Sequence, residues 1–197
     1  MMKTLFVSLK GGVGKSSIAL NYAIYTNTKC VTNDIIAPDN DGMIKVPPSK
    51  KRLPLNCTKK NTVYDFGAMS TNIDPKVAHA IKLCDAVVIP TLTDPRSLQA
   101  TVDTYNLVKE SGKPVAIIIN NFIKQRKHDA AKQFLLSTLG RVPIFAMRST
   151  TLFERVAKDG EQWFSHVHQN NGEYQLNKTR KAHEMIYDAI TRLGVAQ

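Results

Sequence analysis

A glycine-rich stretch near the N-terminus constrains the fold of this chain more than any other feature. It reads KGGVGKSS, runs from Lys10 to Ser17 and directly follows the apolar segment Thr4–Leu9. Glycines let backbone N–H groups turn inward around a phosphate, and a helix beginning at the end of such a loop directs its positive dipole end at the same anion. With a strand expected before it and a helix expected over Lys15–Thr26, the stretch predicts a phosphate-binding loop.

The loop departs from the pattern G-x-x-x-x-G-K-[ST] at one position, because Leu9 stands where the first glycine would be. Its length is unchanged. Lys15 is expected to reach the β- and γ-phosphates, and the hydroxyl of Ser16 is expected to bind Mg²⁺. A glycine-rich turn without a ligand is the alternative, and the strand and helix on either side disfavour it. The loop residues expected to bind nucleotide are Gly11, Gly12, Val13, Gly14, Lys15, Ser16 and Ser17.

Strand and helix patterns alternate along the rest of the chain, which predicts crossover connections and a parallel sheet. We therefore expect an α/β fold: one domain over residues 1–197, with a doubly wound, mostly parallel sheet flanked by helices. Residues 37–60 read as irregular, and Val46–Lys60 as a mobile basic loop. Further strands are expected at Cys30–Asp34, Thr62–Asp65, Ala86–Pro90, Val115–Asn120 and Val142–Ala146. Further helices are expected at Ile73–Leu83, Pro95–Glu110, Lys127–Leu139, Thr151–Asp159 and Thr179–Leu193.

Composition limits the cellular compartment and the partners that this chain is expected to have. No apolar run approaches the ~20 residues that cross a bilayer, and residues 1–9 read as a strand instead of a leader. The three cysteines match no metal or redox spacing, and Cys30 and Cys84 are expected to be core thiols in a cytoplasmic protein. The net charge of +11 favours a polyanionic partner, although a merely positive surface is also compatible with it.

Lys10 adds a second lysine at the start of the loop. With it, KGGVGKSS looks like the loop of the ParA/MinD family of deviant Walker ATPases, and most resembles the ParA-type plasmid and chromosome partition ATPases. The resemblance implies ATP and Mg²⁺ as ligands, a homodimer that forms on ATP, and slow, partner-stimulated hydrolysis. It implies that Lys10 reaches the nucleotide of the other subunit and, like an arginine finger, neutralises charge as the γ-phosphate bond breaks.

Two further segments resemble parts of the same family. Thr62–Gly67 (TVYDFG) looks like its Walker B strand, which implies that Asp65 orients Mg²⁺, although a capping role after the strand is the alternative. Val115–Asn121 (VAIIINN) resembles the strand whose last asparagine contacts adenine. We carry that role to Asn120, while Asn121 could serve instead.

The water-positioning aspartate has the weakest match in this chain. The family pattern D-x-D-P-Q fits poorly, and Asp34 best corresponds to its second aspartate, with Thr32 at the first. The other alignment puts Asp34 on the first aspartate and Ile36 in the catalytic place, which predicts nucleotide binding with slow or absent hydrolysis. Asp39 is the reserve candidate. Lys10, Lys15 and Asp34 are the expected catalytic residues.

The resemblance also implies non-specific DNA binding, a role in segregation, a centromere-binding adaptor protein and association with the nucleoid. Basic clusters lie between Met43 and Tyr64, at Lys124–Lys127 and near the last helix. The last one is our choice for DNA contact, and such clusters are otherwise solvated faces. The expected DNA-binding residues are Lys178, Arg180 and Lys181.

Two other functions remain open at this point. One is a positioning module that binds nucleotide with little turnover. The other is a MinD-like ATPase on a membrane, for which a basic amphipathic C-terminal helix would be needed. Ala182–Leu193 is amphipathic, with Met185 on its apolar side, but its polar side carries Glu184 and Asp188. We expect this helix to pack on the sheet and expect no membrane partner.

Overall fold

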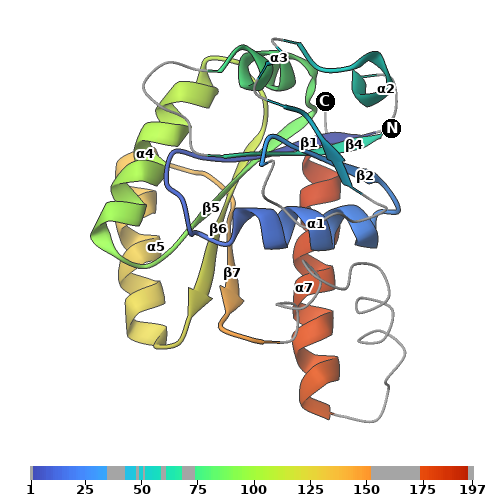
Figure 1. Cartoon of the computed structure of the whole chain (residues 1–197). Helices are drawn as coiled ribbons and strands as arrows, with labels where there is room; N and C mark the ends of the chain where they lie inside the picture. Colours follow the sequence, from blue (N-terminus) through green and yellow to red (C-terminus); the bar gives the residue numbers. More distant parts are fainter. Residues whose placement is uncertain are drawn as a thin grey trace.

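The computed structural model describes residues 2–34, 43–47, 49–50, 52–58, 61–67, 74–151 and 174–194. In this part of the chain, seven parallel strands form one sheet in the order β3-β2-β4-β1-β5-β6-β7, as Figure 1 shows. The strands are β1 (Lys3–Ser8), β2 (Lys29–Thr32), β3 (Met43–Lys45), β4 (Thr62–Gly67), β5 (Ala86–Thr91), β6 (Val115–Phe122) and β7 (Ile144–Arg148). The helices are α1 (Lys15–Tyr25), α2 (Leu55–Thr58), α3 (Pro75–Leu83), α4 (Pro95–Lys109), α5 (Gln125–Leu139) and α7 (Tyr174–Leu193). The predicted α/β class is confirmed.

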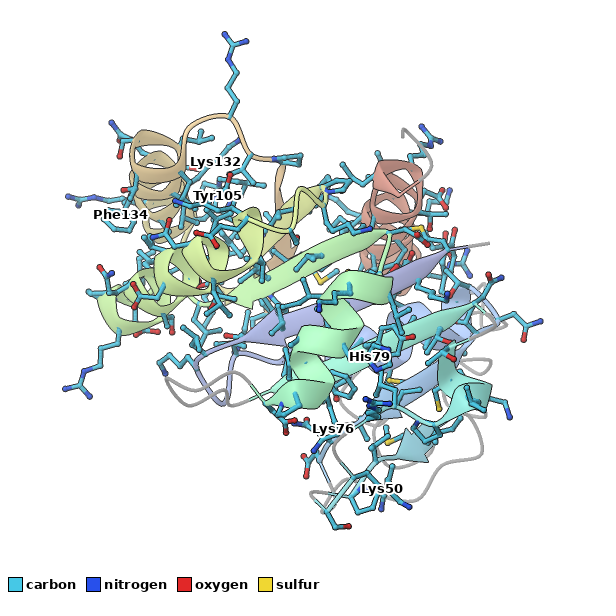
Figure 2. The ribbon with its side chains drawn as sticks, turned by 90° about the horizontal axis from the view of Figure 1, so that it is seen from above. Lys50, Lys76, His79, Tyr105, Lys132 and Phe134 are labelled. Carbon is cyan, nitrogen blue, oxygen red and sulfur yellow. The ribbon has the colours of Figure 1, made fainter. Side chains whose placement is uncertain are left out.

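The sheet is covered on both faces, which is why the side chains of β1 and β5 are buried almost without interruption. Along β1, Leu5 and Val7 face a core shared with α3, α4 and α5, whereas Phe6 faces a core shared with α1 and α7. Figure 2 looks onto the first face, with Lys76 and His79 on α3 and Tyr105 on α4. Successive side chains of a strand point to opposite faces, so one buried strand serves two cores.

Two helices begin with the same dipeptide, and the reason is local. Asp74 accepts a hydrogen bond from the backbone N–H of Lys76 at 2.8 Å, and Asp94 accepts one from that of Ser97 at 3.0 Å. A proline follows each aspartate at a position where the helix needs no N–H donor. These caps set the starts of α3 and α4.

The stretch predicted to be irregular contains regular structure. Strand β3 pairs in parallel with β2, Cys30 aligning with Met43, and α2 lies within the predicted basic loop Val46–Lys60. The hydroxyl of Tyr64 donates to the carbonyl of Cys57 at 2.8 Å and ties this segment to β4. The prediction was wrong because three- and four-residue elements carry almost no periodicity. Of the predicted helix Thr151–Asp159, only Thr151 lies within the described residues.

The last helix packs on the sheet as predicted and begins earlier, at Tyr174. Ile186 and Ile190 are buried against α1 and the sheet, but Met185 is 73% exposed and is not on the buried side. Cys30 and Cys84 are buried thiols as expected. Among the described residues, no helix combines the length and the apolar character that crossing a membrane requires.

Candidate functional site

The glycine-rich loop occupies the centre of the sheet. It follows β1, whose neighbours are β4 on one side and β5 on the other, and it leads directly into α1 (Figure 1). From β1 the chain crosses to β2 and β3, and it later continues past β5 on the opposite side. Ligands of open parallel sheets bind at the carboxyl ends of the strands where the order reverses in this way. The loop therefore lies where a ligand is expected.

The backbone of the loop requires glycine at two positions. Gly12 has φ 77° and Gly14 has φ 81°, in the left-handed region that other residues adopt only with strain. Gly14 precedes α1, and its carbonyl accepts the first helical hydrogen bond, from Ile18 at 3.1 Å. No side chain caps this helix start. The N–H groups of its first turn remain available to an anion.

Lys15 of the loop and Asp65 of β4 form a buried ion pair within the candidate site. The carboxylate of Asp65 is 1% exposed, and it also accepts a hydrogen bond from the hydroxyl of Thr32 at 3.2 Å. The ammonium of Lys15 lies 3.4 Å from the hydroxyl of Ser16. A Cβ atom on Gly67 would lie 2.7 Å from that ammonium, so only glycine leaves room for this lysine. The sequence-predicted phosphate and metal residues thus meet at one point.

A cavity of about 500 Å³ opens over the loop. Lys10, Lys15, Ser16 and Asp34 all line it, as does Gly67 at the end of β4. The three predicted catalytic residues are therefore brought together, whereas Ile36 and Asp39 lie outside the described residues.

Thr32 connects Asp34 to the carboxylate of Asp65. Its hydroxyl donates to Asp65 and accepts the backbone N–H of Asp34 at 3.0 Å. Asn33 is held to the next strand, because its side-chain oxygen accepts the N–H of Gly67 at 3.3 Å. These two contacts fix the end of β2 against the end of β4 and place Asp34 at the cavity.

A second cavity of about 190 Å³ adjoins the loop at Gly12, Gly14 and Ser17. Asn120 and Asn121 line it from β6. Its other walls come from residues of α1 and α7 and from the ends of β5 and β7, which packing brings together. These are Ile18, Asn21, Leu92, Met147, Arg148, Thr150, His183 and Tyr187.

Two groups give the second cavity polar character. Among the described residues, the side-chain oxygen of Asn21 is buried and has no hydrogen-bond partner, although its amide donates to Ser17 at 2.7 Å. A buried acceptor without a partner is costly, and a ligand could supply the donor. Burial lowers the pKa of His183, and the carbonyl of Thr179 opposes this only in part. His183 is therefore neutral at pH 7.

Lys10 lies at the entrance of the loop. Its backbone N–H donates to the hydroxyl of Ser8 at 3.2 Å, and the preceding N–H of Leu9 donates to the hydroxyl of Thr104 at 3.1 Å. The pKa of Asp94 is lowered mainly by the hydrogen bond from Ser97, and the nearby charge of Lys10 adds to this. The start of α4 and the first lysine of the loop are thus electrostatically coupled.

Mg²⁺ would find hard oxygen donors here. Among the described residues no group of three or more His, Cys, Asp or Glu side chains could enclose a metal ion. The carboxylate of Asp65 and the hydroxyl of Ser16 nevertheless both lie within hydrogen-bond range of the Lys15 ammonium. Mg²⁺ prefers this arrangement, one or two protein oxygens beside substrate phosphates.

The predicted DNA-contact residues lie at the start of α7. Lys178 and Lys181 are exposed, and Arg180 pairs with Glu184 at 3.6 Å. In Figure 1 the beginnings of α5 and α7 both lie beyond the carboxyl ends of β6 and β7. The basic clusters of these two helices therefore share one edge of the molecule.

No family model matches the chain, and no curated protein matches it. Solved structures do. The cell division ATPase MinD of Pyrococcus furiosus aligns with a TM-score of 0.63 and 13% identity, covering 96% of this chain and 100% of that one. The chain has the fold of the ParA/MinD-type ATPases.

Two structures with bound nucleotide share the ParA/MinD fold with this chain. A candidate plasmid partition protein of Borrelia burgdorferi B31 bound to AMPPNP aligns with a TM-score of 0.60 and 15% identity, covering 96% of this chain and 99% of that one. MinD of Pyrococcus horikoshii with Mg-ADP aligns with a TM-score of 0.61 and 12% identity, covering 94% of this chain and 95% of that one. Identities this low establish the ParA/MinD fold and leave the activity of this chain to its own residues.

Proposed function

We propose that this chain is a ParA-like ATPase that dimerises on ATP, binds DNA without sequence preference and drives plasmid or chromosome segregation through ATP hydrolysis. The observation that carries the proposal is the cavity over the loop, where Lys10, Lys15 and Asp34 meet beside the buried carboxylate of Asp65. Nucleotide and Mg²⁺ in two structures of this fold are consistent with it.

One nucleotide would occupy both cavities, with its phosphates in the larger one and its base and ribose in the smaller one. Gly11 to Ser17 would bind the phosphates through inward N–H groups, the α1 dipole and the ammonium of Lys15. The smaller cavity, lined by Asn120 and the neutral His183, would take the base and ribose. Because both cavities share Gly12, Gly14 and Ser17, one ligand can fill them together.

Ser16 and Asp65 would hold Mg²⁺, which supplies charge neutralisation to the phosphates when bound. For this to happen, Lys15 must leave the carboxylate of Asp65 and turn to the phosphates. The two changes are mutually favourable, because the ammonium exchanges one anion for another and the carboxylate gains a cation. Asp65 keeps its hydrogen bond from Thr32 as an anchor.

Hydrolysis needs an oriented water and a positive charge at the γ-phosphate. Asp34 lines the phosphate cavity and would orient the water, and Lys15 would stabilise charge within the same subunit. Lys10 would act on the nucleotide of the other subunit, so that the site is complete only in a homodimer. A centromere-binding adaptor would stimulate a slow intrinsic rate.

DNA binding would use the edge where α5 and α7 begin (Figure 1). Exposed Lys178 and Lys181 on α7 lie at the same edge as the exposed cluster at the start of α5. Lys and Arg contacts to phosphates suffice for binding without sequence preference, and they would associate the protein with the nucleoid in the cytoplasm. The α5 cluster consists of Lys124, Arg126 and Lys127.

DNA binding measured by fluorescence anisotropy with ATP, with ADP and without nucleotide tests the proposal, with light scattering to follow dimer formation. We expect ATP to produce a dimer and to tighten DNA binding, and Lys10→Ala to reduce ATP hydrolysis by at least about 10³-fold, because it removes a charge from the transition state. DNA affinity that is the same in all three nucleotide states would refute the segregation switch.

Two assays separate this function from its rivals. A positioning module without turnover would hydrolyse ATP no faster than Asp34→Ala does. A MinD-like membrane ATPase would sediment with anionic liposomes. The packing of α7 disfavours the second, because Tyr25 of α1 donates a hydrogen bond to Asp188 at 2.8 Å and both Ile186 and Ile190 are buried.

A further inference from the structure

Asn120, at the end of β6, is hydrogen-bonded to the glycine-rich loop. Its side-chain amide donates a hydrogen bond to the carbonyl of Val13 at 3.0 Å, across 107 residues of sequence. We propose that Asn120 is a positioning residue that holds the loop in its phosphate-binding conformation, in addition to any contact with the base. The inference rests on the proposed nucleotide-binding function of this site.

The contact is built into the loop itself. A Cβ atom on Gly14 would lie 2.2 Å from the amide nitrogen of Asn120, so any other residue at this position would expel the asparagine. Gly14 therefore serves two purposes: it adopts φ 81°, and it leaves space for Asn120. Val13, which accepts the hydrogen bond, is itself buried. The loop is thus fixed at its middle by backbone conformation, burial and a side chain from another strand.

The anchor of this contact is rigid. Strand β6 pairs with β5 on one side and β7 on the other, and Ile117, Ile118 and Ile119 before Asn120 are fully buried. The pairing with β7 shifts register between Ile119 and Phe122, and Asn121 adopts a positive φ of 54°. The strand therefore ends in a defined bend that presents Asn120 to the loop.

The contact has a consequence for the phosphates. Lys15 and the N–H groups of the first turn of α1 follow Val13 immediately, so a displaced Val13 carbonyl moves the groups that would bind the triphosphate. A protein amide hydrogen bond contributes about 0.5–1.5 kcal/mol, which corresponds to about a 2- to 10-fold change in an equilibrium constant. Loss of the asparagine amide should therefore weaken phosphate binding by that factor even when the ligand has no base.

Hydrogen exchange of the nucleotide-free full-length chain tests the contact directly. We expect Asn120→Ala and Asn120→Asp, which cannot donate to a carbonyl, to speed exchange of the amides of residues 10–17 by about 2- to 10-fold. Asn106→Ala is the comparison: it removes an exposed asparagine of α4, whose side-chain oxygen accepts a hydrogen bond from Lys109, and should leave loop exchange as in the wild type. Circular dichroism confirms that each variant is folded. Unchanged loop exchange in both folded Asn120 variants would overturn the proposal.

Calorimetric titration with Mg-ATP and with magnesium tripolyphosphate separates loop positioning from base recognition. We expect Asn120→Asp to weaken tripolyphosphate and ATP by similar factors. A loss confined to ATP would show that Asn120 serves the base alone and would overturn the inference. A wild-type chain that binds neither ligand would instead refute the proposed function, while the exchange experiment would still decide whether Asn120 holds the loop.

Discussion

Under the proposed function, Lys15 would exchange one anionic partner, the carboxylate of Asp65, for another, the phosphates of a nucleotide. Its ammonium is paired with the carboxylate of Asp65, and the absence of a side chain on Gly67 leaves it the necessary space. Removing one partner of a buried ion pair leaves an uncompensated charge, which is costly. Under the proposed function, the pair would hold Lys15 in an ordered position and would keep Asp65 from a metal ion until nucleotide and Mg²⁺ bind together.

Asp65→Asn should uncouple nucleotide binding from Mg²⁺. The amide cannot act as an anionic partner of Lys15 or as a good Mg²⁺ ligand, so we expect affinity for metal-free ATP to be kept or increased. The additional affinity that Mg²⁺ brings should fall by about 10- to 100-fold. Calorimetric titrations of ATP with Mg²⁺ and with EDTA measure both quantities, and Asp103→Asn on the exposed side of α4 is the control. An Asp65→Asn protein with full Mg²⁺ dependence would place the metal elsewhere.

Gly67→Ala should displace Lys15 without touching the loop. The added Cβ would lie 2.4 Å from the Lys15 Cε atom, which must then move. Because Lys15 must leave Asp65 to reach the phosphates, disturbing this resting pair should keep or increase the affinity for metal-free ATP in a titration, as in Asp65→Asn. Gly112→Ala, at φ 68° and with nothing within 4 Å of the added Cβ, is the control for a destabilising glycine replacement away from the site. An ATP affinity below that of Gly112→Ala would contradict this exchange of partners by Lys15.

Some residues of the candidate site could be predicted from the sequence, and others could not. Lys10, Lys15 and Asp65 could be predicted because each lies in a short motif at a strand end, where the residue type and its position indicate phosphate or metal binding. The contact from Asn120 to Val13 and the place of His183 beside the loop could not be, because they depend on which strand and helix pack next to β1. Such neighbours are set by the whole fold.

At the scale of elements, α4 links the loop to the rest of the molecule. The hydroxyl of Thr104 accepts a hydrogen bond from the N–H of Leu9. At the start of the helix, the charge of Lys10 helps to lower the pKa of Asp94. A helix start that is well capped holds both contacts in place. Replacing Asp94 should therefore lower the stability of the fold more than it changes the candidate site.

Asp94→Ala should reduce stability by about 1 kcal/mol at pH 7, because the cap of α4 is removed. The pKa of Asp94 is lowered in the folded chain, so the stability that its ionisation adds is complete above the ordinary aspartate value of about 3.9. This contribution disappears as the pH falls through the lower folded pKa. Urea unfolding should show a difference between wild type and Asp94→Ala that shrinks below about pH 4. Asp103→Ala should change little, and a difference that grows in acid would contradict the assignment.

The salt dependence of DNA binding can show whether the basic cluster on α5 or the one on α7 contacts DNA. Each lysine that no longer neutralises a DNA phosphate lowers the slope of log K against log salt by about 0.9, so Lys178→Gln combined with Lys181→Gln should lower it by about two. Lys124→Gln combined with Lys127→Gln makes the same charge change on α5. If neither pair alters the slope in anisotropy titrations at several salt concentrations, DNA does not bind this edge.

Elements differ in how well the sequence predicts them. Strands β1, β5 and β6 are apolar runs beside glycine or proline, and their positions were predicted within two residues. Strand β3 has only three residues, Met43–Lys45, in a basic stretch, and its existence depends on pairing with β2. The strand predicted at Val142–Ala146 begins instead at Ile144. Val142 is buried outside the sheet, so an apolar residue at this position does not by itself indicate a strand.

At the scale of the whole molecule, strand order determines the chemistry. The alternation of strands and helices predicts a parallel sheet, but only the order β2-β4-β1-β5 brings the ends of β2 and β4 beside the loop after β1. Asp34, Asp65 and Lys15 then converge at one edge, while the smaller cavity between β6 and α7 opens next to them. A homodimer that presents Lys10 to the opposite subunit would complete this arrangement.

Calorimetric titration of Mg-ATP into the wild type and into Lys15→Ala tests the central claim most directly, because every role proposed for the site requires a bound triphosphate. The account predicts saturable binding with one nucleotide per wild-type chain, and affinity at least about 10-fold lower for folded Lys15→Ala. No heat with the wild type, or equal affinities for the two proteins, would contradict it.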